Sequence, residues 1–131
     1  MTGREGRKRV LIVDDEKLIE DTLAQILNAS GFDAVATYSG EQAVELTPFV
    51  KPEVLIADVV MGGMNGVDAA IAISKIVPKC KVIICSGQVD SEGLVHKAEE
   101  QGYKFELLLK PVHPSLLIDR LKWMWRVDGV A

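Results

Sequence analysis

The chain has 131 residues, which fits one compact domain of ordinary size. Hydrophobic residues make up 48% of it, enough for a core that needs no disulfide or structural metal, and 26% are charged, as in ordinary globular domains. The formal net charge of -4 argues against a nucleic-acid surface, which requires clustered Lys and Arg.

Basic side chains cluster near the N-terminus, at Arg4, Arg7, Lys8 and Arg9. We interpret residues 1–7 as a flexible basic leader ahead of a core at about residues 8–127. Cys80 and Cys85 are too few for a disulfide framework or a zinc site, and free thiols suit a reducing cytoplasm. Because no run is apolar enough to cross a membrane and the start lacks a signal-peptide core, we expect a cytoplasmic protein with no membrane or nucleic-acid partner.

Strand-like and helix-like patterns alternate along the chain. In chain order they are a strand at 10–13, a helix from about 18 to Gly31, a strand at 33–38, a helix at 39–49, a strand at 54–59, a helix at 69–76, a strand at 81–85, a helix at 91–101, a strand at 105–109 and a helix at 114–127. Val10–Val13 is a β-branched run, typical of a strand buried on both faces, and apolar residues from Leu18 to Leu27 recur at helical spacing. Ser39 and Gln42 form a capping box for the second helix.

Five strands alternating with five helices predict an α/β fold, a doubly wound five-stranded parallel sheet with helices on both faces. Crossover connections between parallel strands are right-handed, which leaves few topologies. The functional site of such a sheet lies at the carboxyl ends of its strands. Chemistry is therefore expected at that edge.

Charged and polar residues follow the predicted strands at this edge. Asp14 and Asp15 end the first strand, Asp58 the third, Ser86 the fourth and Lys110 the fifth. Each alone could be a helix cap, a turn residue or a solvated charge. Because all of them fall at one edge of one sheet, we favour a shared function over separate structural roles.

Three carboxylates gathered at one place repel one another and cost stability unless a cation joins them. Lys110 is the one cationic side chain that the predicted topology brings near. An oxygen-rich site without thiols suits Mg²⁺, which keeps positions for water and phosphate. A carboxylate, a metal, a hydroxyl and a lysine together indicate phosphoryl transfer.

These residues resemble a known family, the receiver domain of response regulators of two-component phosphorelay systems, in particular chemotaxis-regulator-like members. The matching motifs are Asp14-Asp15, Val54–Asp58, Met61–Gly66, Ser86 and Lys110-Pro111. The resemblance covers about Lys8 to Val127. It implies a flavodoxin-like fold with strand order 2-1-3-4-5, and one receiver domain over residues 1–131.

The resemblance also implies a metal site and a phosphoacceptor. Asp15 and Asp58 would bind Mg²⁺ directly together with the backbone carbonyl of Val60, and Asp14 would act through a metal-bound water. Asp58 would be the nucleophile that takes a phosphoryl group from a phosphohistidine.

Two more residues and several partners follow from the resemblance. Lys110 would neutralise one phosphoryl oxygen and Ser86 would donate a hydrogen bond to another, so that phosphorylation moves the loop after the fourth strand. The phosphodonor would be a sensor histidine kinase or a histidine phosphotransfer protein. The fourth helix, fifth strand and fifth helix would bind a downstream protein target or a second copy. Such a domain is a signalling module that promotes only its own phosphorylation and dephosphorylation, not an enzyme.

Several positions depart from the usual family pattern. Gly62 stands where Pro is usual, and Leu107 stands where an aromatic residue is common. Val60 stands where many members carry a polar side chain that helps to place the attacking water. We therefore expect a slowly hydrolysing phosphoaspartate at Asp58, with Gln88 as a partial substitute for water placement.

Other functional classes fit the sequence less well. An FMN-binding flavodoxin-like domain needs a loop rich in Ser, Thr and Gly after the first strand, whereas Asp14-Asp15-Glu16 would repel phosphate. An aspartate phosphatase usually has a second acid where Val60 stands. A P-loop enzyme needs a Gly-rich loop ending in Lys-Ser or Lys-Thr. A receiver-like domain that no longer accepts phosphate is disfavoured because the key side chains are present. His96 and His113 lack ligand spacing and are interpreted as solvated or capping residues.

Overall fold

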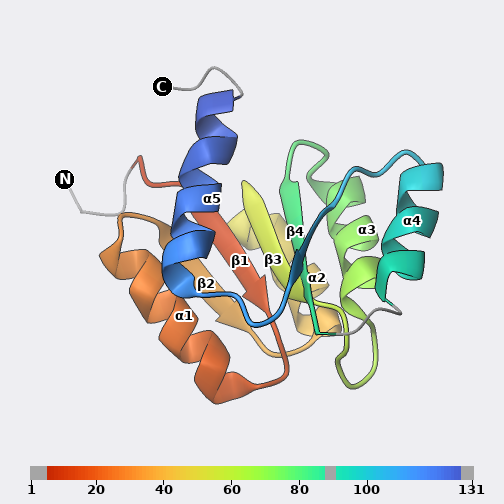
Figure 1. Cartoon of the computed structure of the whole chain (residues 1–131), viewed down its shortest axis with the longest axis horizontal. Helices are drawn as coiled ribbons and strands as arrows, with labels where there is room; N and C mark the ends of the chain where they lie inside the picture. The colour runs from red at the N-terminus through yellow and green to blue at the C-terminus, as the bar shows by residue number, and fades with distance from the viewer. Residues whose placement is uncertain (1–5, 88–90, 128–131) are drawn as a thin grey trace.

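The computed structural model describes residues 6–87 and 91–127, and Figure 1 shows its arrangement. The strands are β1 (Arg9–Val13), β2 (Asp33–Thr37), β3 (Val54–Asp58), β4 (Lys81–Ser86) and β5 (Glu106–Leu109). The helices are α1 (Lys17–Ala29), α2 (Gly40–Val50), α3 (Gly66–Ile76), α4 (Ser91–Glu100) and α5 (Pro114–Val127). The predicted alternation of strands and helices is confirmed.

The strands form one parallel five-stranded sheet in the order β2-β1-β3-β4-β5. Helices α1 and α5 cover one face of this sheet, and α2, α3 and α4 cover the other (Figure 1). The doubly wound topology and its strand order are therefore as expected. The carboxyl ends of β1, β3, β4 and β5 meet at one edge, the lower edge in Figure 1.

The core has two halves because successive residues of a strand point to opposite faces of the sheet. In β1, Leu11 and Val13 belong to the cluster under α2, α3 and α4, whereas Val10 and Ile12 belong to the cluster under α1 and α5. All of these side chains are almost fully buried. Burial on both faces explains why this strand is a continuous apolar run.

Local capping sets where two helices begin. Ser39 caps α2 as predicted, since the backbone N–H of Gln42 donates to Ser39 Oγ over 3.0 Å. The return bond of the predicted capping box is shifted by one residue, because Gln42 Oε1 accepts from the backbone N–H of Tyr38 over 2.9 Å. Helix α3 begins at Gly66, three residues before the expected start at residue 69, because Asn65 caps it by accepting from the backbone N–H of Asp68 over 2.9 Å.

Helix α1 is turned differently from what its apolar pattern suggested. Leu18 and Ile19 are exposed, and the buried positions of this helix are Glu20, Ala24 and Leu27. These three share one helical face, at spacings of four and three residues. A glutamate therefore points into the fold where an aliphatic side chain would be ordinary.

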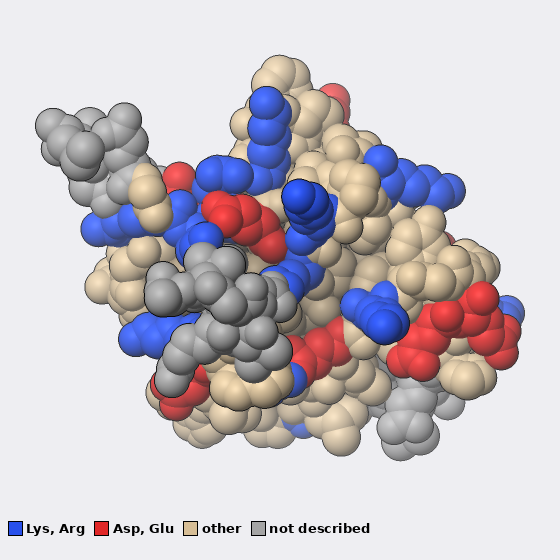
Figure 2. Space-filling model, turned by 90° about the horizontal axis from the view of Figure 1, so that it is seen from above, with Lys and Arg blue, Asp and Glu red and all other residues tan. Residues whose placement is uncertain are grey.

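The described part of the basic N-terminal segment contacts the domain. Arg7 Nη1 donates to the carbonyl oxygen of Asn28 over 3.0 Å, and Lys8 and Arg9 pair with Glu53 over 3.4 and 3.3 Å. Arg4 lies outside the described residues. Figure 2 shows the end of the molecule away from the site edge, where Lys and Arg side chains alternate with Asp and Glu. Among the described residues, no helix has the length and apolar character to span a bilayer.

Candidate functional site

Backbone hydrogen bonds extend beyond the strands and fix the residues that follow them. The N–H of Asp14 donates to the carbonyl of Thr37 over 3.2 Å, and the N–H of Lys110 donates to the carbonyl of Ser86 over 2.8 Å. Asp58, the last residue of β3, pairs in register with Cys85 of β4. Backbone pairing between the strands thus holds Asp14, Asp58, Ser86 and Lys110 at the carboxyl edge.

The three aspartates meet as the sequence predicted. One carboxylate oxygen from each of Asp14, Asp15 and Asp58 lies within 4.8 Å of the others. Lys110 Nζ lies 3.1 Å from Asp58 Oδ1 and 3.8 Å from Asp14 Oδ2. Asp14 is 5% exposed, so its charge is poorly screened by solvent.

Electrostatics at Asp58 reflect this crowding. Burial raises the pKa of Asp58, the contact with Lys110 lowers it, and the charges of Asp14 and Asp15 raise it, with a net increase. Burial lowers the pKa of Lys110, but the contacts with Asp58 and Asp14 outweigh it and raise the pKa overall. Asp58 is therefore held beside a lysine that stays protonated at neutral pH.

The donor set fits a hard divalent cation. Within the described part of the chain, the cluster pairs three carboxylates with one ammonium group. All the donors offered by Asp14, Asp15 and Asp58 are carboxylate oxygens, the ligands that Mg²⁺ prefers. The thiol beside this site stays protonated, since burial raises the pKa of Cys85 to about 12. A soft-metal site is not favoured here.

The turn after β3 is shaped by two glycines. The N–H of Gly66 donates to the carbonyl of Val59 over 3.0 Å, and a Cβ on Gly66 would lie 2.1 Å from the carbonyl oxygen of Asp58. Gly62 donates its N–H to Asp15 Oδ2 over 3.2 Å. Proline has no N–H, so the glycine gives Asp15 a contact that the usual family residue could not supply.

Ser86 and Val60 lie at the same edge but differ in exposure. Ser86 ends β4 and is 1% exposed, next to Lys110 through their backbone hydrogen bond. Val60 follows β3 and is 56% exposed. Its side chain leaves the region beside Asp58 without a polar group at this position, as the sequence pattern suggested.

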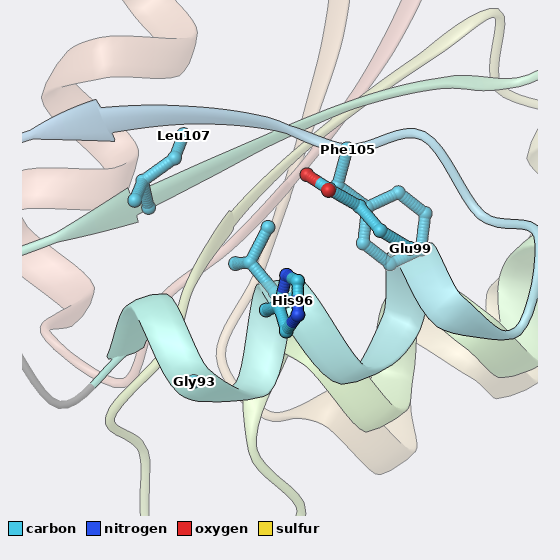
Figure 3. Close-up of a pocket in the computed structure, with 6 residues that line it drawn as sticks. Gly93, His96, Glu99, Phe105 and Leu107 are labelled. Atoms are coloured by element: carbon cyan, nitrogen blue, oxygen red, sulfur yellow. The ribbon is translucent and has the colours of Figure 1, made fainter.

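Leu107, the other departure from the family pattern, lines a groove between α4 and β5. Figure 3 shows this groove with Gly93, His96 and Glu99 on α4 and with Phe105 and Leu107 on the opposite side. Phe105 is buried and belongs to the core. His96 is exposed and lies 3.2 Å from Glu100, which fits its interpretation as a solvated surface residue.

Sequence reasoning missed Glu20, an acidic residue close to this site. The pKa of Glu20 is raised to about 9, first by burial and then by the charges of Asp14 and Asp58, although Lys110 lowers it. Glu20 lies four residues before Ala24 and seven before Leu27, the buried face of α1. This spacing could have indicated that Glu20 is buried. Leu18 and Ile19, which are apolar but exposed, suggested a different buried face.

The buried carboxyl of Glu20 should cost stability at neutral pH. Its native pKa of about 9 exceeds its ordinary value of 4.5, so between these values the folded chain retains a proton that the unfolded chain loses. Stability falls as the pH rises through this window. We expect Glu20→Leu to raise the free energy of unfolding by about 2 kcal/mol at neutral pH.

Urea denaturation in the presence of a chelator measures this effect. The difference in the free energy of unfolding between Glu20→Leu and the wild type should decrease as the pH is lowered toward the ordinary pKa of the carboxyl. Glu45→Leu, on the exposed face of α2, is the matched control and should change stability by less than about 0.5 kcal/mol. A destabilised Glu20→Leu protein would show that the carboxyl makes a favourable contact.

Comparison with known proteins agrees with this site. The family described as "Response regulator receiver domain" matches residues 10–122. The chain is 36% identical over 115 residues to the chemotaxis protein CheY of Thermotoga maritima, covering 87% of this chain and 94% of that protein. It is 38% identical over 117 residues to the transcriptional regulatory protein PdtaR of Mycobacterium tuberculosis, covering 88% of this chain but only 55% of that one.

A solved structure supports the fold. A CheY-like receiver domain protein from Methanospirillum hungatei superposes with a TM-score of 0.83 at 23% identity, covering 95% of this chain and 98% of the other. The strand order and the layers described above are those of this flavodoxin-like, CheY-type fold. Since the family match spans most of the sequence, the chain belongs to the response-regulator receiver domains, the phosphoacceptor signalling modules of two-component systems.

Proposed function

We propose that Asp58 accepts the phosphoryl group and that Asp14, Asp15 and Lys110 make this possible. The observation that carries the proposal is the contact of Lys110 Nζ with Asp58 Oδ1, at 3.1 Å, inside a cluster of three carboxylates. A lysine beside the nucleophile can neutralise a phosphoryl oxygen as charge develops on it. The excess of carboxylates leaves room for a second positive charge.

Phosphoryl transfer at this site needs one bond made and one broken. A carboxylate oxygen of Asp58 attacks phosphorus, the phosphorus–nitrogen bond of a phosphohistidine breaks, and the imidazole leaves with the bond's electron pair. Asp15, Asp58 and the carbonyl of Val60 would hold Mg²⁺, with Asp14 acting through a water molecule. When bound, this ion neutralises charge on the transferring group.

The other predicted residues have roles in the response. The hydroxyl of Ser86 would donate a hydrogen bond to the phosphoryl group, and the loop after β4 would move with it. The α4–β5 groove of Figure 3, with Leu107 on its β5 side, would change shape and bind a downstream protein or a second copy through α4, β5 and α5. The phosphodonor would be a histidine kinase or a histidine phosphotransfer protein.

We further propose that residues 1–131 act as one cytoplasmic receiver domain and perform no chemistry on a separate substrate. A partner protein, not a nucleic acid or a membrane, would receive the signal. The net charge of -4 and the ion pairs of Lys8 and Arg9 with Glu53 support this part of the proposal.

Incubation with acetyl phosphate and Mg²⁺, followed by intact-protein mass spectrometry, tests the function. We expect the wild type to gain the mass of one phosphoryl group and Asp58→Asn to gain none, because an amide is a far weaker nucleophile than a carboxylate. Phosphorylation of Asp58→Asn to the same extent, or failure of the wild type in both the presence and absence of Mg²⁺, would contradict the proposal.

Val60 should set the lifetime of the phosphorylated state. Its exposed aliphatic side chain cannot hydrogen-bond a water molecule beside Asp58. We expect Val60→Asn to hydrolyse about tenfold faster, the effect of one added hydrogen bond to the attacking water. Loss of the phosphoryl mass over time measures it. A wild-type lifetime of only seconds, with Val60→Asn no faster, would count against this role.

A further inference from the structure

A cavity lies on the α1 side of the phosphoryl site. Its volume is about 460 Å³, within the range of small-molecule sites. Leu23 of α1, Ile56 of β3 and Leu117 of α5 contribute apolar walls. Asp58 and Lys110 line the same cavity, so anything bound there lies beside the proposed phosphoacceptor.

Glu20 also lines this cavity, and it lacks a complete set of partners. Glu20 is 3% exposed, and its Oε2 atom has no hydrogen-bond partner among the described residues. Buried polar atoms without partners are rare in folded proteins. The ammonium group of Lys110, which lines the same cavity, contacts Asp58 and Asp14.

Acidic side chains outnumber cationic ones around the cavity. The acidic side chains that line it are Asp14, Glu16, Glu20 and Asp58, and among the described residues that line it Lys110 is the single cationic one. A ligand that supplies a hydrogen-bond donor and a positive charge would complement the acidic side, and an apolar body would complement the walls. A neutral apolar ligand would leave Glu20 unpartnered, and an anion would be repelled.

We propose that this space, the Glu20 cavity, binds a small organic ammonium ion. Its ammonium group donates to the carboxyl of Glu20, and its apolar body packs against Leu23, Ile56 and Leu117. Because Asp58 and Lys110 line the same cavity, the bound cation alters the charge that the phosphoryl group meets. A small molecule bound at this site would therefore regulate the domain, in addition to regulation by the phosphodonor. Binding does not require phosphorylation.

Titration of the unphosphorylated protein with hexylammonium, without Mg²⁺ and followed by NMR amide shifts, tests this inference. We expect saturable binding, with affinity at least about tenfold weaker for methylammonium, which lacks the apolar body, and for hexanol, which lacks the charge. Glu20→Gln, which keeps the shape of the side chain, should weaken hexylammonium binding about tenfold. Glu20→Leu, which removes the carboxyl, should weaken it at least as much.

Asp15→Asn distinguishes the cavity from the aspartate cluster. Asp15 belongs to the cluster but does not line the cavity, so this variant should keep the wild-type affinity for hexylammonium. The inference is overturned by an absence of saturable binding, by equal affinity for hexanol, or by binding that Asp15→Asn removes and Glu20→Gln leaves unchanged. The last result would place the ammonium ion among the aspartates.

Discussion

Replacing Lys110 with alanine should slow phosphorylation by acetyl phosphate about a hundredfold without preventing Mg²⁺ binding. Lys110 supplies the ammonium group 3.1 Å from Asp58 Oδ1, so its loss removes the fixed positive charge that would meet the developing phosphoryl charge. The carboxylates of Asp14, Asp15 and Asp58 remain, and they no longer share the site with a competing cation. Mg²⁺ affinity should therefore stay the same or increase.

Time courses of phosphorylation by mass spectrometry and Mg²⁺ titrations by NMR separate these two effects. Lys104→Ala, at an exposed position before β5, is the matched control and should match the wild type in both measurements. An unchanged phosphorylation rate in Lys110→Ala would show that this lysine serves the structure alone. A loss of both Mg²⁺ binding and phosphorylation would indicate that the site had collapsed.

The edge of the sheet was predictable because it follows from the order of elements. When strands alternate with helices, the strands run parallel and their carboxyl ends lie at one edge of the sheet. This places four residues at that edge, independently of their side-chain conformations: Asp14, Asp58, Ser86 and Lys110. The contacts of Lys110 with Asp58 and Asp14 agree with that reasoning. The topology, inferred from apolar runs and turn residues, was enough to predict which residues lie together at this edge.

The environment of Glu20 was not predictable by the same means. Helical spacing narrows the buried face of α1 to a few positions, but Leu18 and Ile19 compete with Glu20 and Ala24 for the inward orientation. The outcome depends on how the helix packs against the sheet and against α5, which is distant from it in sequence. The local pattern predicts an apolar residue on the buried face of α1, whereas tertiary packing places Glu20 there. Such conflicts are common near functional sites.

The start of α3 and the geometry of the turn after β3 depend on hydrogen bonds that the spacing of apolar residues does not predict. The cap of Asn65 on Asp68 moved the start of α3 to Gly66, and the contact from Gly62 to Asp15 has no counterpart in a Pro-containing turn. Such contacts decide the geometry of the site within a fold that is already determined.

Replacing Gly66 with alanine should reduce the free energy of unfolding by about 3 kcal/mol, because its Cβ would lie 2.1 Å from the carbonyl oxygen of Asp58. That atom belongs to backbone and cannot move away as a flexible side chain would, so β3 or α3 must shift and the phosphoacceptor with it. Urea denaturation checks the stability, and acetyl phosphate labelling checks the site. Gly93→Ala, where an added Cβ meets nothing within 4 Å, should instead stabilise α4 by about 0.5–1 kcal/mol. Equal unfolding midpoints for Gly66→Ala and the wild type would show that α3 and Asp58 do not approach this closely.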